Sequence, residues 1–303
     1  MIVNRVFSPD VYRRIMEASP DKKDDIYRYE LMKPFQGKWD CYHIPLKAKY
    51  PGGYDIIMAN NMMGLAKPSD INGDFKDQID MLSDKKLWDA CQCSIETALK
   101  RFTDRGIGLK VEEYLYSIFL ANPDNPYTIM NEGYCGDGGI PGYIMGWLVP
   151  SEVTVRRLPA ALAHETDHNV RYQYIKWTDN VDLGEMIVSE GLAENFATAL
   201  FGEEFLGPWV ARTDRKTLSS VKGIIRDNLG VTGLENITAY LYGDEMAQMQ
   251  QYPKAGLPYC AGYATGYHLV RYFLDKTGTP VEEATVLPSE VILKEAEGFW
   301  KQG

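Results

Sequence analysis

The most constraining feature of this 303-residue chain is a segment that carries two closely spaced histidines. Residues 158–174 read LPAALAHETDHNVRYQY, and the Ala, Leu and Glu residues favour one continuous helix. Pro159 suits the first helical position, so we predict a helix over residues 158–176. His164 and His168 lie four residues apart, slightly more than one turn, so both imidazoles point from the same helical face. The fold must therefore accommodate a helix with two histidines on one side.

Two imidazoles on one helical face can bind a single metal ion. The chain has only four histidines, and two of them fall at this spacing. Glu165 lies next to His164, near enough to reach a metal-bound water without being a ligand itself. This arrangement of His-Glu-x-x-His on a helix is the geometry that a zinc hydrolase requires. The residues therefore indicate a Zn²⁺ site formed by His164 and His168, with Glu165 as the general base.

A second helical segment offers a third ligand. Residues 186–200 read MIVSEGLAENFATAL, with Glu190 and Glu194 one turn apart in an apolar setting. Buried carboxylates are costly without a cation or hydrogen-bond donors. Glu190 as a metal ligand, with Glu194 accepting the outer N–H of a liganding histidine, would satisfy both side chains. The reverse assignment stays open at this point, and on this segment alone two solvent-facing glutamates are the simpler interpretation.

Together these motifs resemble a known group of enzymes. HETDH, followed 22 residues later by Glu190 inside SEGLAE, resembles the gluzincin superfamily of zinc peptidases, which includes thermolysin and the zinc aminopeptidases. More narrowly, GIPGYIMGWLVP, LPAALAHETDHNVRY, SEGLAENFA and AGYATGYHLV resemble a bacterial family of cytoplasmic predicted zinc-dependent proteases. The resemblance covers roughly residues 109–273 and leaves the N-terminal helices unassigned. It implies a thermolysin-like metallopeptidase core.

The resemblance also implies roles for individual residues. It places zinc on His164, His168 and Glu190, makes Glu165 the general base, and gives Glu194 the orienting role in the second shell around a histidine. It favours the glutamate before the glycine, Glu190, over Glu194 as the direct ligand.

Enzymes of this group carry a downstream histidine or tyrosine that stabilises the oxyanion. The segment YCAGYATGYHLVRYF, on a helix expected to begin near Ala261, offers Tyr263, Tyr267 and His268. Tyr263 and Tyr267 share a face, whereas His268 points about 100° away from Tyr267. Simple packing of these rings against the core is the alternative. We name Tyr263 and His268 as candidate catalytic residues.

The order of the local patterns predicts an α+β fold. A helical N-terminal region is expected over residues 1–105, and a metallopeptidase-like catalytic domain over residues 106–303. Within this domain we expect a small, mostly antiparallel sheet over residues 109–150. The active-site helix over residues 158–176 should follow, and then a mainly helical part over residues 183–303.

Three segments have strand-like composition: residues 110–121, 127–131 and 143–149. The last is a candidate edge strand for an extended peptide, with Gly146 as a substrate-binding residue that allows close backbone approach. The intervening GDGGIPG, residues 136–142, is interpreted as a turn between strands. A phosphate loop would be followed by a helix, and here a strand follows.

Charge and cysteine content narrow the classes of partner and compartment. The net charge of −10 disfavours nucleic acid and anionic membranes as partners. The N-terminus has no apolar stretch of the secretory type, and five cysteines form an odd number, so we expect free thiols and a cytoplasmic protein. Cys91 and Cys93 point to different sides of a predicted helix, and His43 is most simply structural.

The sequence therefore predicts a zinc metallopeptidase that acts on a peptide or protein substrate. Two alternatives stay open: a non-peptidase zinc amidohydrolase, and a peptide-binding or regulatory module with a vestigial or structural metal site. A structural zinc site is normally closed by four protein ligands and has no use for Glu165. The presence of Glu165 favours an enzyme.

Overall fold

The structure is a computed structural model that describes residues 1–178 and 180–301. By their contacts, the residues form two compact units, which are described separately. The first unit comprises Met1–Thr97 and Val111–Glu165, and the second comprises Ala98–Lys110 and Thr166–Gly303. The division into residues 1–105 and 106–303 remains a prediction about domains.

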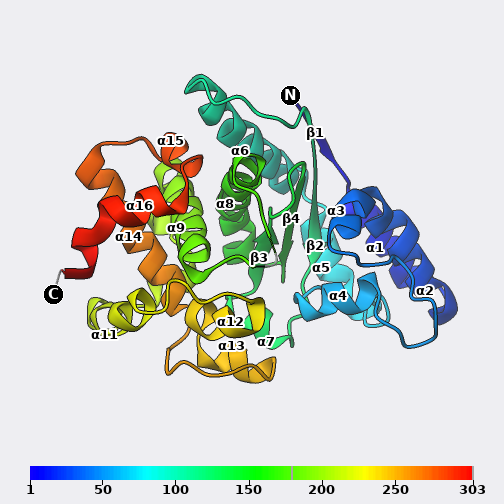
Figure 1. The fold of residues 1–303 in the computed structure, drawn as a ribbon. Coiled ribbons are helices and arrows are strands. Elements are labelled where there is room, and N and C mark those ends of the chain that lie inside the picture. The colour runs from blue at the N-terminus through cyan, green and yellow to red at the C-terminus, as the bar shows by residue number, and fades with distance from the viewer. Residues whose placement is uncertain (179, 302–303) are drawn as a thin grey trace. The chain divides into compact units, whose positions relative to one another are not determined.

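The first unit combines a small sheet with helices that come mainly from the N-terminal region (Figure 1). Its strands are β1 (Ile2–Arg5), β2 (Glu113–Leu120), β3 (Tyr134–Asp137) and β4 (Tyr143–Leu148). Its helices are α1 (Ser8–Glu17), α2 (Pro20–Ile26), α3 (Gln36–Cys41), α4 (Ile56–Met62), α5 (Lys76–Leu82) and α7 (Pro126–Met130), with parts of α6 (Lys85–Asp104) and α8 (Glu152–Tyr174). Short π-helical and 3₁₀ segments cover Tyr27–Met32, Lys33–Phe35 and Gly73–Phe75.

The sheet is mixed, with the strand order β1-β2-β4-β3 (Figure 1). Strands β1 and β2 are parallel, as are β2 and β4, and only β3 with β4 is antiparallel. The α+β class is confirmed, but the expected mostly antiparallel pairing is wrong. One reason is that β1 lies in a region predicted to be helical, and its pairing partner is more than a hundred residues away in sequence. The other is that β2 and β4 also pair in parallel.

Binding of an extended peptide to β4 would require this strand to lie at the edge of the sheet. Strand β4 does not lie there. It lies between β2 and β3, so its backbone groups are paired on both sides. A Cβ atom added to Gly146 would lie 2.9 Å from Leu162 Cδ2 and 3.2 Å from Leu158 Cδ1. Gly146 therefore allows α8 to pack closely on the sheet. The expectation that this strand lies at the edge is wrong, and substrate binding by Gly146 remains a prediction. The edge strands of the sheet are β1 and β3.

Local capping explains two further differences from the sequence prediction. Residues 127–131 were expected to form a strand, but α7 occupies this stretch because Pro126 follows Asn125, whose Oδ1 accepts the Tyr127 N–H at 2.8 Å. Helix α8 begins at Glu152, six residues before the predicted start, so Pro159 is inside the helix. Ser151 and Thr154 exchange backbone-to-hydroxyl hydrogen bonds of 3.0 and 3.1 Å, which fixes this earlier start.

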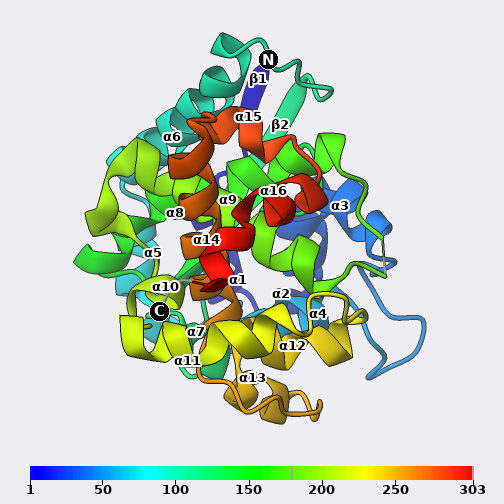
Figure 2. The same ribbon diagram turned by 60° about the vertical axis from the view of Figure 1, so that its left-hand side comes forward.

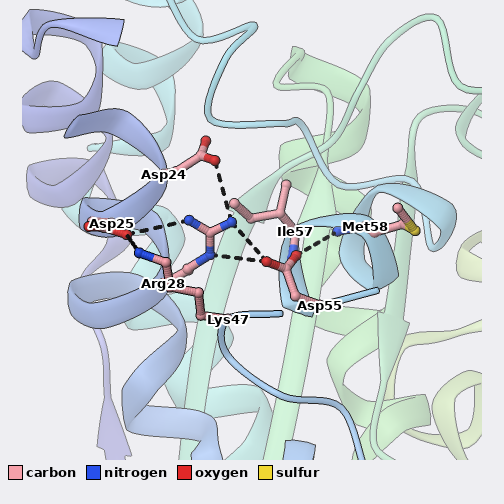
Figure 3. A network of polar contacts seen from close by, with 7 residues as sticks. All are labelled: Asp24, Asp25, Arg28, Lys47, Asp55, Ile57 and Met58. Carbon is pink, nitrogen blue, oxygen red and sulfur yellow. Dashed lines mark hydrogen bonds and ion pairs between the residues drawn. The ribbon is translucent and has the colours of Figure 1, made fainter. Parts of the chain in front are cut away.

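Ion pairs hold the N-terminal helices of the first unit to the loop before α4 (Figure 3). Arg28 Nη2 lies 2.8 Å from Asp55 Oδ2, and both side chains are largely buried. Asp55 Oδ1 also caps α4 by accepting the N–H of Ile57 at 3.0 Å. Asp24 and Asp25 complete the charge balance around the guanidinium. This pair is remote in sequence from the histidine motif and has a structural role.

The second unit is helical. Besides the remaining parts of α6 and α8, its helices are α9 (Leu183–Phe201), α10 (Pro208–Ala211), α11 (Arg215–Arg226), α12 (Leu234–Tyr242), α13 (Asp244–Met249), α14 (Ala261–Thr277), α15 (Val281–Thr285) and α16 (Ser289–Glu295). Short 3₁₀ segments cover Glu203–Phe205 and Ala296–Lys301. Across the described part of the chain, no helix has the length and apolar character needed to cross a bilayer.

Helices α9 and α14 lie side by side at the centre of this unit (Figures 1 and 2). Two glycines make the close approach possible. A Cβ atom on Gly191 would lie 2.2 Å from the carbonyl oxygen of Gly266, and one on Gly266 would lie 2.0 Å from that of Ile187. Leu192, Leu269 and other apolar residues pack around this contact as the core. The two backbones are therefore nearly in van der Waals contact.

A buried arginine links α8 to α9 within the same unit. Arg171 has no exposed side-chain surface, and its Nε and Nη2 donate to the two carboxylate oxygens of Glu185 at 2.9 and 2.8 Å. Its Nη1 donates to the carbonyl oxygens of Thr285 and Leu287. These bonds satisfy the guanidinium and fix α8 along α9.

We expect Gly266→Ala to destabilise the protein by about 2–3 kcal/mol, because the added methyl group overlaps a backbone carbonyl that has no room to move. The matched control is Gly223→Ala on α11, where an added Cβ would meet nothing within 4 Å. Removing a flexible glycine from a helix should raise stability there by about 0.5–1 kcal/mol. Urea unfolding followed by circular dichroism measures both. Equal effects of the two substitutions would contradict the backbone contact.

Candidate metal centre

The structure brings the two histidines of HETDH together with Glu190. One ligand atom from each of His164, His168 and Glu190 lies within 4.8 Å of the others, and all three residues are buried. Helix α8 supplies both imidazoles from one face, and α9 supplies the carboxylate. Two imidazoles and one carboxylate are a donor set that suits zinc.

The separation between the His168 and Glu190 ligand atoms has a size that a zinc ion would produce. His168 Nε2 lies 3.3 Å from Glu190 Oε2. Two ligand atoms at about 2.0–2.1 Å from zinc in a tetrahedral arrangement lie about 3.3–3.4 Å apart. This pair of ligand atoms therefore has the spacing that a shared zinc ion would impose.

The other ring nitrogen of His168 has its own partner. Nδ1 lies 3.1 Å from Ser189 Oγ, and that oxygen lies 3.0 Å from Tyr172 Oη. A metal at Nε2 leaves the proton on Nδ1, which then donates to Ser189 and fixes the ring orientation. Burial raises the pKa of Tyr172, so its hydroxyl stays protonated at neutral pH.

Glu194 is buried and accepts two hydrogen bonds from the segment around the start of α10. Oε1 accepts the Gly207 N–H at 2.6 Å, and Oε2 accepts the Trp209 indole N–H at 2.8 Å. Because Ser189 already serves His168, any contact of Glu194 with an outer ring nitrogen would be made with His164. The orienting role of Glu194 remains a prediction.

Glu165 is held by the glycine-rich turn between β3 and β4. Its Oε2 accepts the Gly138 N–H at 2.7 Å. A Cβ atom on Gly136 would lie 2.4 Å from Glu165 Cγ, and one on Gly138 would lie 1.9 Å from the Glu165 carbonyl oxygen. GDGGIPG is thus a turn between strands, as predicted, and its glycines also make room for Glu165.

The three aromatic candidates on α14 have different surroundings. Tyr267 Oη donates to Glu203 Oε2 at 2.7 Å and accepts from Arg271 Nη2 at 2.8 Å, and burial raises its pKa to about 12. Burial, together with the charge of Arg271, lowers the pKa of His268, which therefore favours the neutral ring. The Tyr263 ring packs 6.5 Å from the Trp209 ring, whose indole N–H donates to Glu194. Catalytic roles for Tyr263 and His268 remain predictions.

Sequence reasoning missed the residues that support the candidate ligands. Ser189 precedes Glu190 inside SEGLAE, so a serine next to the third ligand was a usable signal. Gly138 was seen only as part of a turn. Trp209 lies on a different helix after a Gly-Pro break, and no local pattern connects it with Glu194.

Comparisons with known proteins identify the family of this chain. The family described as "Predicted Zn-dependent protease (DUF2268)" matches residues 87–294. The chain belongs to this family. It is also 34% identical over 300 residues to "Uncharacterized protein YjfC" of Bacillus subtilis (strain 168), covering 99% of both chains. No solved structure gives a significant match.

Family membership confirms the zinc expectation. The family is described as Zn-dependent, and the matched residues include α8, α9 and α14, which carry the candidate ligands and aromatic residues. Residues 1–86 lie outside the family match, although the Bacillus subtilis relative is similar over almost the whole chain.

We expect Glu190→Gln to lose more zinc affinity than Glu194→Gln, because the first deletes a charged ligand and the second alters only its surroundings. Glu194→Gln should weaken zinc binding by about 10–100-fold. Its amide NH₂ would face either the Gly207 or the Trp209 N–H, so one donor loses its acceptor. Glu283→Gln, at an exposed position on α15, is the control and should bind like the unmodified protein. Zinc titration of the three variants tests this order, and a larger loss at Glu194 would reverse the assignment.

Proposed function

We propose that this protein is a zinc metallopeptidase of the gluzincin type, with His164, His168 and Glu190 as zinc ligands and Glu165 as the general base. One observation carries the proposal: three buried side chains of ligand type converge, and a further buried carboxylate, Glu165, follows His164 on α8. A structural site would not need this extra carboxylate. The thermolysin-like core belongs to the proposal.

Zinc, when bound, would supply a Lewis acid that activates water and polarises a carbonyl group. The chain itself supplies the proton transfer. The carboxylate of Glu165 accepts a proton from the attacking water and donates it to the leaving amine. The Gly138 N–H bond to Oε2 orients this carboxylate. The other oxygen, Oε1, would make the proton transfer.

The peptide would bind along β3, the strand at the edge of the sheet next to Glu165. Strand β3 pairs with β4 on one side, and an extended peptide could add to its other side through main-chain hydrogen bonds. Gly136, at which a side chain would overlap Glu165, lies on this strand. This assignment replaces the one that sequence analysis gave to β4.

The proposal includes a cytoplasmic location and a peptide or protein substrate, with neither nucleic acid nor membrane as a partner. All five cysteines are free thiols, which suits a reducing compartment. The net charge of −10 opposes binding to polyanions.

Glu165→Gln should keep zinc stoichiometry near that of the unmodified protein and lower peptide hydrolysis by about 100- to 10,000-fold, because it removes the base and no ligand. The assay is cleavage of a peptide library by the purified, zinc-loaded protein, with zinc measured by elemental analysis. Glu152→Gln, at an exposed position of the same helix, should leave both quantities unchanged.

Two further measurements complete this test. A chelator should abolish cleavage, and added zinc should restore it. Cleavage of small amides but of no peptide would favour a zinc amidohydrolase. Full peptidase activity in Glu165→Gln would show that the proposed mechanism is wrong.

A further inference from the structure

A fully buried lysine lies in the N-terminal region, outside the family match. Lys38, on α3, has no exposed side-chain surface, and its Nζ lies 2.8 Å from Asp137 Oδ1. The Tyr42 and Trp39 rings lie 5.0 and 5.8 Å from the ammonium group. A buried ammonium group is costly without a counter-ion, so the position of Asp137 is tightly coupled to that of Lys38.

Asp137 ends β3 and begins the glycine-rich turn. Its Oδ1, which contacts Lys38, also accepts the Gly139 N–H at 2.9 Å. One carboxylate oxygen therefore joins the lysine to the backbone two residues further along. Gly138, between these two attachment points, donates its N–H to Glu165 at 2.7 Å.

The backbone at Gly136 and Gly138 packs so closely on Glu165 that there is no room for a side chain between them. Side chains at residues 136 and 138 would overlap Glu165 itself, as the distances of 2.4 and 1.9 Å show. A displacement of the turn would therefore either break the Gly138 bond or push Glu165 from its position. The Lys38–Asp137 pair acts on the carboxylate through this turn.

Helix α3 contacts the same β3–β4 connection at two further places. A Cβ atom on Gly37 would lie 2.2 Å from Tyr143 Oη, at the start of β4. Tyr42 Oη lies 3.1 Å from the position of a Cβ atom on Gly139. Gly37 and Tyr42 thus lie close to the start of β4 and to Gly139, beside the Lys38–Asp137 pair.

We propose that Lys38 and Asp137 are positioning residues, whose ion pair holds the Gly136–Gly139 turn so that the Gly138 N–H orients the carboxylate of Glu165. The inference rests on the proposed function only in taking Glu165 as the base. It gives the N-terminal region a role in completing the active site. Neither residue touches the substrate or the metal in this proposal.

The test compares Lys38→Met with Arg28→Met in the full-length protein. Arg28 also forms a buried ion pair in the N-terminal region, with Asp55, and its ion-pair partners are Asp24, Asp25 and Asp55 (Figure 3). Each substitution leaves one aspartate of the first unit without its buried cation. Hydrogen–deuterium exchange of peptides spanning residues 134–142, with and without zinc, reports on the turn. Melting temperature reports on general stability.

In Lys38→Met, exchange at the turn should rise about tenfold or more, because losing a hydrogen bond to a charged group changes a local equilibrium by at least this factor. The kcat for the peptide that is cleaved fastest should fall about 100-fold, with KM changed little, since binding is kept and the base is misplaced. Arg28→Met should lower the melting temperature and change neither exchange at the turn nor kcat.

A double variant, Lys38→Met with Asp137→Asn, separates positioning from stability and also serves if Lys38→Met does not fold. It leaves no buried charge unpaired, so the melting temperature should return toward that of the unmodified protein. Positioning predicts that exchange at the turn stays raised and kcat stays low. The inference would be overturned if the double variant regained normal exchange at the turn and normal kcat together with its stability. Unchanged exchange in Lys38→Met would also overturn it.

Failure of the proposed function is distinguishable from failure of this inference. If the unmodified protein cleaves no peptide, the peptidase assignment fails. The exchange measurement still decides whether Lys38 holds the turn against Glu165.

Discussion

The arrangement of the candidate site depends on one buried ion pair, between Arg171 and Glu185. A guanidinium without solvent is tolerated here because Glu185 and two backbone carbonyls accept its hydrogen bonds. Arg171 lies about one turn after His168 on α8, and Glu185 lies just over one turn before Glu190 on α9. The Arg171–Glu185 pair therefore sets the register of α8 against α9, in which His168 meets Glu190. Loss of either charge would leave the other buried and would loosen this register.

Local sequence patterns predicted the long helices α8, α9 and α14 and the strands β2 and β4, because periodicity acts over a few residues. The failures arose where a distant contact or an overlooked cap decided the outcome. Strand β1 forms through parallel pairing with β2, and no local pattern near Ile2–Arg5 predicts this pairing. The start of α8 depends on Ser151 and Thr154, whose reciprocal bonds outweigh the preference of Pro159 for a first turn. The capping residues themselves, Asn125 before α7 and Ser151 before α8, are readable in the sequence.

The candidate site was more predictable than the sheet, because its ligands come from two short motifs on regular helices. The spacing of His164 and His168 fixes their common face, and SEGLAE supplies Glu190. The groups that hold these residues in place were not predictable in the same way. Lys38 and Trp209 reach their partners through tertiary contacts over long sequence separations. Catalytic motifs are local, whereas the support that orients them is distributed over the fold.

The close contact of α9 with α14 bears on how the metal ion is taken up. In small zinc domains most of the free energy of metal binding is used to fold the chain. Here Gly191 and Gly266 bring the two backbones together within an apolar core of their own, and Glu190 is next to that contact. Uptake of the ion then costs little ordering entropy and changes the heat capacity little. Exchange of zinc with competing cellular chelators would accordingly follow the protonation of the ligands and would not require unfolding.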